Sequence, residues 1–136
     1  MTTTHNLGTL VARILLAAIF ILAGIGKLGD VQGFAGYMAS GGVPAFLVWP
    51  VILFEILGGI ALLIGFLTRP AALALGVFSI VAAVLYHFVP ADQAQMTNFM
   101  KNIALGGGYL ALALLGGGQW SVDAVLGGRS HSAAAA

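Results

Sequence analysis

The chain has 136 residues, of which 60% are hydrophobic and 7% are charged, and its formal net charge is +1. This composition is that of an integral membrane protein rather than a soluble domain, and the small net charge without a basic patch argues against nucleic-acid binding. The sequence contains no cysteine, which excludes disulfides, cysteine-ligated iron–sulfur clusters and thiolate zinc sites.

Four apolar stretches are each long enough to cross a bilayer as a helix, which takes about 20 residues. They cover residues 7–26, 44–67, 70–89 and 98–115. The first lacks the basic start and the cleavage site of a signal peptide, so we expect it to be a membrane span. The sequence therefore predicts one all-α domain over residues 1–136, an integral membrane four-helix bundle. Residues 116–136 are predicted to be a tail, with Ser132–Ala136 disordered.

The connections between the spans predict their arrangement. Residues 68–70 join the second and third spans by so short a link that these two must be antiparallel neighbours, and Pro44 and Pro70 suit the first turns of their helices. An even number of spans places both termini on one side of the membrane. Arg69 and Arg129 lie on that side, so the positive-inside rule favours cytoplasmic termini.

Small residues recur at four-residue spacing within the spans. In lipid, such positions let helix backbones approach closely, and we expect them to form packing faces and to allow a homo-oligomer. The pairs are Gly8/Ala12, Ala61/Gly65, Ala72/Gly76, Ser79/Ala83 and Ala104/Gly108. The glycine run at residues 116–118 is predicted to end the fourth helix.

Glu55 is the only charged residue in the second apolar stretch. A carboxylate at the bilayer centre costs about 2.5–3.5 kcal/mol on insertion scales, so it marks a functional or partnered site. Counting helical rise from the span ends places Arg13 within reach of Glu55, which predicts an Arg13–Glu55 contact. Such a pair either orients two helices or serves a ligand site. Alternatively, Arg13 extends to the headgroups and leaves Glu55 to a proton or another donor.

A second group of polar residues lies toward the opposite face of the membrane. His87, Lys101 and Asn102 are expected there, above the buried carboxylate, although lysines near helix ends also simply extend to the interface. The candidates for ligand binding or proton handling are Glu55, Arg13, His87, Lys101 and Asn102, with Lys27, Tyr109 and Arg69 as secondary candidates. No catalytic residue is assigned.

Several chemistries can be weighed against these residues. Haem with two axial histidines is not expected, because only His87 lies near a span, and no metal-ligand spacing, nucleophile triad or phosphate-binding loop is present. A protonatable carboxylate with a nearby histidine suits a quinone pocket lined by aromatic residues, and it equally suits a proton-coupled carrier. Tyr37, Trp49, Tyr86 and Trp120 also fit the role of interfacial anchors.

Four segments together resemble the DoxX family of small bacterial membrane proteins. They read ARILLAAIFILAGIGKL, FEILGGIALLIGFLTRPAAL, YHF and NFMKNIALGGGYLALALLGGGQWSVD, and they extend from Leu10 to Asp123. The resemblance implies a multi-pass protein of the bacterial inner membrane. It also implies that the characteristic polar positions of the family correspond to Arg13, Lys27, Glu55, Arg69, His87, Lys101 and Asn102.

The resemblance implies a redox setting, because the family takes its name from a subunit type associated with thiosulfate:quinone oxidoreduction. The expected function is a redox-associated accessory subunit, without an assigned catalytic role, that binds a quinone-like or other lipophilic small molecule within the bundle. The expected partners are the lipid bilayer and either further copies of the chain or a membrane redox complex. A proton-coupled carrier or channel for a small solute, and a structural partner subunit, are the alternatives.

Overall fold

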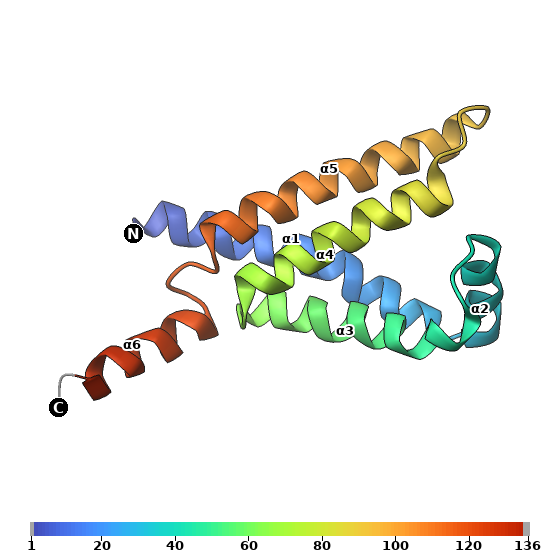
Figure 1. The fold of residues 1–136 in the computed structure, drawn as a ribbon. Coiled ribbons are helices and arrows are strands. Elements are labelled where there is room, and N and C mark those ends of the chain that lie inside the picture. Colours follow the sequence, from blue (N-terminus) through green and yellow to red (C-terminus); the bar gives the residue numbers. More distant parts are fainter. Residues whose placement is uncertain (1, 135–136) are drawn as a thin grey trace.

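The computed structural model describes the backbone of residues 2–134 and the side chains of residues 2–128, and every regular element in that range is a helix (Figure 1). The elements are α1 (Thr3–Lys27), α2 (Val31–Ser40), the 3₁₀ turn η1 (Ala45–Leu47), α3 (Val48–Ile64), α4 (Thr68–Ala82), the π-helical turn η2 (Ala83–His87), α5 (Gln93–Leu115) and α6 (Val122–Ala134). The all-α fold class is therefore confirmed.

Within residues 2–134, three helical stretches are long and apolar enough to cross a membrane: Thr3–Lys27, Ala45–Ile64 and Thr68–His87. They correspond to the first three predicted spans. The fourth predicted span lies in α5, which has 23 residues but begins with a polar half. That half contains Gln93, Gln95, Thr97, Asn98, Lys101 and Asn102. The fourth span and the side on which the termini lie stay predictions, and Arg129 lies outside the described side chains.

The four longest helices are arranged as two pairs. Helix α1 packs mainly against α3, and α4 packs mainly against α5, while the short turn between Ile64 and Thr68 joins the pairs. In Figure 1 the two pairs diverge toward the end of the molecule at which α2 lies. This divergence leaves room for the site described below.

Glycines allow close packing within each pair. A Cβ atom on Gly24 would lie 2.6 Å from Ile56 Cγ1, and one on Gly59 would lie 2.7 Å from Ile21 Cγ1. Gly76 and Gly106 play the same part between α4 and α5, where a Cβ atom on either residue would meet a neighbouring side chain at 2.9 Å. In lipid, where burial of apolar groups drives little association, such close backbone contacts fix how the helices pack.

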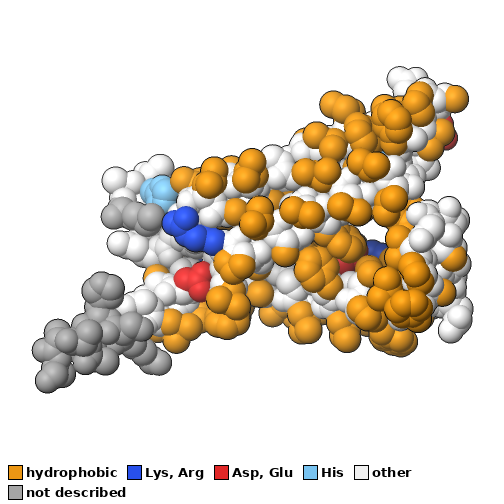
Figure 2. Space-filling model, viewed as in Figure 1, with side chains coloured by type: hydrophobic (Ala, Val, Ile, Leu, Met, Phe, Trp, Pro, Cys, Tyr) orange, Lys and Arg blue, Asp and Glu red, His pale blue; other side chains and the backbone are white. Residues whose placement is uncertain are grey.

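The core lies where the two pairs meet. Its buried residues come from α1, α3, α4 and α5, and they are Ala17, Phe20, Leu62, Ala72, Leu75, Tyr109 and Leu112. The outward faces of the long helices are also apolar: Leu22 is 69% exposed and Leu57 is 61% exposed. Figure 2 shows such side chains covering α3, α4 and α5. This surface suits contact with lipid rather than with water.

Helix α2 was not predicted, because the sequence between the first two spans was taken as a loop. Asp30 caps the helix by accepting a hydrogen bond from the Gly33 amide at 2.8 Å. A small buried cluster of Ala35, Met38, Val48 and Ile52 holds α2 against the start of α3. The linking segment therefore forms a wall of the molecule instead of an open loop.

The C-terminal segment differs in part from its prediction. As expected, the glycine run ends α5, since the helix stops at Leu115 and Gly116 has a φ of +84°. The tail, however, contains α6, and residues 132–134 belong to this helix rather than to a disordered end. Residues 135 and 136 lie outside the described residues.

Candidate functional site

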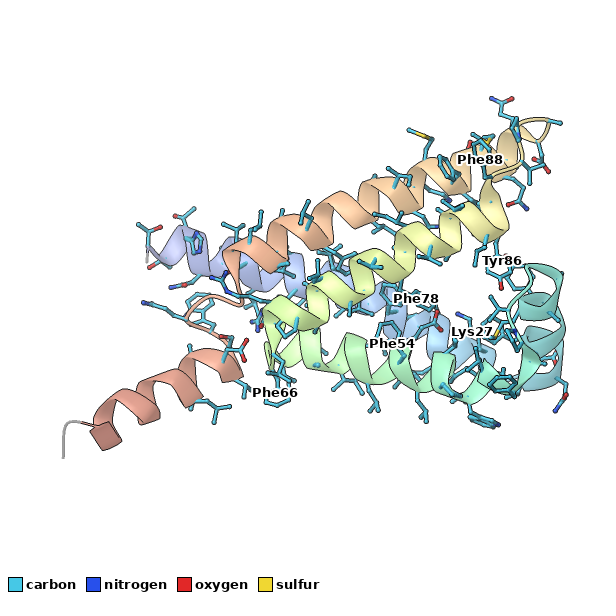
Figure 3. All side chains as sticks on the ribbon, viewed as in Figure 1. Lys27, Phe54, Phe66, Phe78, Tyr86 and Phe88 are labelled. Carbon is cyan, nitrogen blue, oxygen red and sulfur yellow. The ribbon has the colours of Figure 1, made fainter. Side chains whose placement is uncertain are left out.

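A cavity of about 450 Å³ lies in the space where the helix pairs diverge. This volume is within the range of about 300–1,000 Å³ found for small-molecule pockets. Its walls are mostly apolar, and its polar groups come from α1, α3, α4, η2 and α5. The lining residues include Phe20, Lys27, Phe34, Tyr37, Met38, Glu55, Phe78, Ser79, Tyr86, His87 and Asn102. Figure 3 labels Lys27, Phe78 and Tyr86 around this space.

The Lys27–Glu55 ion pair forms the charged wall of the cavity. Lys27 Nζ lies 2.9 Å from Glu55 Oε1 and 2.7 Å from Oε2. The side chain of Glu55 is 5% exposed and that of Lys27 is 20% exposed. Lys27 Nζ also lies 4.8 Å from the centre of the Phe34 ring, so an aromatic face stabilises the ammonium group. The pair gives the cavity polar atoms without a net charge.

The predicted Arg13–Glu55 contact is wrong. Arg13 is 1% exposed, and its Nη2 donates a hydrogen bond to the carbonyl oxygen of Trp120 at 2.5 Å. It packs against Gly65, which lies ten residues, or about 15 Å of helix, beyond Glu55. The count of helical rise assumed that α1 and α3 end at one level, whereas α1 extends past the end of α3 (Figure 1).

The glycine contacts between α1 and α3 set the correct pairing. A Cβ atom on Gly24 would lie 3.4 Å from Glu55 Cβ, so Glu55 faces the last turns of α1. Lys27 is the final residue of that helix and can extend back to the carboxylate. Lys27 was thus a secondary candidate that the structure brings to Glu55, while Arg13 lies elsewhere.

His87 and Asn102 form the opposite wall of the cavity. Ser79 Oγ donates a hydrogen bond to Asn102 Oδ1 at 3.4 Å, and His87 Nδ1 lies 2.8 Å from Gln95 Oε1. Because an amide oxygen only accepts, this assignment places the hydrogen of a neutral imidazole on Nδ1 and leaves Nε2 as an acceptor. Gln95 was not predicted, since nothing in its spacing marks it as the partner of a histidine.

Two tyrosines tie α2 to the π-helical turn η2. The Tyr86 hydroxyl donates a hydrogen bond to the carbonyl oxygen of Met38 at 2.9 Å, and the Tyr86 and Tyr37 rings stack with centroids 4.7 Å apart. Both residues were predicted only as interfacial anchors or as members of a general aromatic lining. The contact needs the position of α2, which the sequence pattern does not indicate.

The remaining candidates lie outside this cavity. Lys101 lines a neighbouring hollow together with His87, Asn98 and Asn102. Tyr109 is buried in the core, where its hydroxyl donates to the carbonyl oxygen of Leu16 at 2.7 Å. Arg69 is exposed beside Gly116 at the other end of the molecule.

Arg13 belongs to a polar group at that other end, which we call the terminal cluster. Its members are Asn6, Arg13, Leu67, Thr68, Gln119, Trp120 and Asp123. Asn6 and Gln119 exchange two hydrogen bonds, at 3.0 and 3.1 Å. The Asp123 carboxylate accepts hydrogen bonds from the amides of Leu67 and Thr68, each at 2.8 Å, and so caps the start of α4.

The surroundings of Asp123 change its acidity. Partial burial raises the pKa of this carboxyl group, but the hydrogen bonds from Thr68 and Leu67 and the positive charge of Arg13 together outweigh that effect. The pKa of Asp123 therefore lies below its ordinary value. The terminal cluster was missed because it joins residues far apart in the sequence.

The family of this chain follows from its similarity to known proteins. The DoxX family model matches residues 8–88. The chain belongs to the DoxX family. The match runs from α1 to the end of η2 and therefore includes Lys27, Glu55 and His87, whereas Asn102 follows it.

Individual relatives agree with this DoxX assignment. The inner membrane protein YqjF of Escherichia coli (strain K12) is 44% identical over 122 residues, which cover 90% of this chain and 94% of the relative. The inner membrane protein YphA of the same organism is 35% identical over 121 residues, covering 84% and 86%. The putative oxidoreductase CatD of Bacillus subtilis (strain 168) is 29% identical over 69 residues, covering 51% and 52%. No solved structure matches the chain.

These relatives and the apolar helices fix where this DoxX protein is located. It is a multi-pass protein of the bacterial inner membrane. The cavity beside Glu55 consequently lies among helices that cross or face lipid.

Proposed function

We propose that this protein is a redox-associated accessory subunit that binds a quinone-like, uncharged lipophilic molecule in the cavity between its helix pairs. In this proposal, α5 is the fourth span of a four-helix bundle with both termini in the cytoplasm. The observation that carries the proposal is the Lys27–Glu55 ion pair in the wall of an otherwise apolar cavity.

The chemistry of the cavity suits a carbonyl-bearing ring. Lys27 carries three N–H donors, two of which are directed at Glu55, so its ammonium group can also meet a carbonyl oxygen. With Nδ1 directed at Gln95, the Nε2 atom of His87 is left to meet a hydroxyl group on the opposite wall. Phe20 and Phe78 add flat apolar contact. A quinone presents carbonyl groups and its reduced form presents hydroxyl groups, so both forms find partners here.

The proposed redox association is supported by the name of one relative as well as by the cavity. One distant relative carries the name putative oxidoreductase. The match to that relative covers about half of this chain, so the name supports a redox association and assigns no reaction. No residue of the cavity is proposed to be catalytic.

The test compares two carboxylate-to-amide changes, one in the cavity wall and one in the terminal cluster. Glu55→Gln keeps the side-chain shape but removes the counter-ion of Lys27, and we expect the amount of co-purified or added ubiquinone per protein to fall at least tenfold. Asp123→Asn is the matched control and should retain the ligand, because Asp123 lies in the terminal cluster. Native mass spectrometry of gently purified protein measures the occupancy. Equal occupancy in both variants, or an empty wild-type protein after addition of quinone, would refute the proposal.

A proton-coupled carrier is the second candidate function. The cavity and the hollow that contains Lys101 share four lining residues, namely Ile19, His87, Asn102 and Leu105. Protonatable groups thus line two adjoining spaces across the molecule. Solute uptake into proteoliposomes that is driven by a proton gradient and is lost in Glu55→Gln would favour the carrier over the accessory subunit.

A further inference from the structure

The cavity opens sideways, between α4–η2 and the α2–α3 side of the molecule. Figure 2 shows a hollow there, with basic and acidic atoms visible at its floor. Val81 and Leu85 line the cavity and are 49% and 44% exposed, so the wall on the α4–η2 side reaches the outer surface. Val43 and Val51 line the opposite side. We call the opening between these four residues the side mouth.

Helix α2 covers the end of the cavity toward which the helix pairs diverge. The hydrogen bond from Tyr86 to Met38 and the stacking of Tyr86 on Tyr37 attach this helix to η2. Gly41, just after α2, also fits closely against the Tyr86 ring, since a Cβ atom there would lie 2.6 Å from Tyr86 Cζ. The route along the long axis of the molecule is therefore covered, while the side mouth is edged by four aliphatic residues.

We infer that the cavity is filled from the hydrocarbon layer through the side mouth, and that its ligand is an uncharged molecule dissolved in the bilayer. The ligand class rests on the proposed function, whereas the route does not. A charged molecule would lose its hydration on this path, and the Lys27–Glu55 pair offers no net charge to offset that cost. The polar head of the ligand lies beside this pair, and its apolar remainder passes Val81 and Leu85 into lipid.

Val81 and Leu85 consequently select ligands by width. Both side chains line the cavity and reach the outer surface, and neither takes part in the hydrogen bonds at Lys27 and His87. A bulky side chain at Leu85 narrows the mouth without altering the floor of the cavity. Because Leu85 faces lipid, the fold tolerates such a change better than it tolerates a change in the core.

The absence of cysteine from the chain permits a direct test with single-cysteine variants in proteoliposomes. Ala82→Cys places a thiol in the cavity wall, and Leu57→Cys places one on the exposed face of α3 as a control. Two reagents with the same reactive group are compared: uncharged benzyl methanethiosulfonate and charged 2-sulfonatoethyl methanethiosulfonate. Labelling is measured by mass spectrometry as a rate relative to the control.

We expect the uncharged reagent to label both variants and the charged reagent to label neither at an appreciable rate. Adding Leu85→Trp should slow labelling of the Ala82→Cys variant at least tenfold, and Leu85→Ala should accelerate it, with the Leu57→Cys control unchanged. Labelling of the cavity by the charged reagent, no labelling by the uncharged one, or rates independent of residue 85 would overturn the route. If the protein binds quinone but the labelling results differ from these expectations, the lateral route is wrong and the proposed ligand stands. If the labelling results agree but no quinone binds, the proposed ligand is wrong and the route stands.

Discussion

Lys27 and Glu55 form an ion pair in the cavity wall, and the loss of either residue affects both the stability of the protein and the chemistry of the cavity. The carboxylate is nearly buried, and the ammonium group is its counter-ion. A buried pair of this kind adds little stability in comparison with apolar residues of the same shape, but removal of one member leaves an uncompensated charge. The pair therefore makes the two positions interdependent.

Lys27→Met should lower the free energy of unfolding by about 3–5 kcal/mol, because Glu55 then lacks a counter-ion. The double variant Lys27→Met with Glu55→Gln should recover most of that loss. Thermal unfolding of the purified protein in detergent, followed by circular dichroism, measures both. Lys101→Met is the matched control, since Lys101 is exposed and its loss should change stability by less than about 0.5 kcal/mol. Equal stability of the two lysine variants would contradict the role assigned to the pair.

The sequence indicates which residues are candidates for the site more reliably than it indicates which residues they contact. A lone carboxylate within an apolar stretch is visible without a structure, and so Glu55 could be selected. The partner of Glu55 depends on the offset between α1 and α3 along their axes, and the close contacts at Gly24 and Gly59 set that offset. The hydrogen bond between His87 and Gln95 likewise depends on the π-helical turn.

Close backbone contact between α1 and α3 fixes the relative position of these two helices and so the geometry of the cavity wall. Gly24→Ala introduces a methyl group 2.6 Å from Ile56 Cγ1 and 3.3 Å from the Ile56 backbone nitrogen, so the Ile56 side chain or the helix that carries it must shift. Gly26 lies two residues later in the same helix, and a Cβ atom there would have no neighbour within 4 Å. The two positions therefore share helix propensity but differ in packing.

We expect Gly24→Ala to destabilise the protein by about 1–3 kcal/mol through overpacking. Gly26→Ala should be neutral or stabilising by up to about 1 kcal/mol, since alanine favours the helix. Denaturant titration in mixed micelles compares them. If both variants behaved alike, the α1–α3 contact would not be the element that determines the register.

Long apolar helices were predictable, whereas the short helices were not. A run of about 20 apolar residues has few alternatives in a membrane, which is why the first three spans agree with the structure. Helix α2 has only ten residues, and its stability depends on packing against Val48 and Ile52 rather than on its own pattern. Helix α6 lies in a segment whose glycines and serines are typical of a tail.

The terminal cluster joins three distant parts of the chain, namely α1, the start of α4 and the segment that leads into α6. Asp123 lies at the start of α6 and caps α4, while Arg13 of α1 bonds to Trp120. The Asp123 amide also donates to the carbonyl oxygen of Gly65 at 2.9 Å. This end of the molecule is thus closed by hydrogen bonds, whereas at the opposite end the helix pairs diverge around the cavity and α2 covers it.

The low pKa of Asp123 makes this closure sensitive to acid. Its stabilising effect is complete above the unfolded-state pKa of about 3.9 and is lost as the pH falls through the lower folded-state pKa. We expect the melting temperature of the wild type to fall as the pH drops below about 4, and to fall less steeply in Asp123→Asn. Melting curves recorded across the acid range test this, and parallel pH profiles of the two proteins would show that the carboxylate does not contribute.

Because the helix pairs meet at one end and diverge at the other, the protein is wedge-shaped in the plane of its pairs. A wedge displaces more area in one leaflet than in the other, so the lateral pressure of the wider leaflet acts on the angle between the pairs. A molecule in the cavity resists that compression from within. We therefore expect the composition of the bilayer to alter ligand affinity by changing the mechanical work needed to keep the pairs apart.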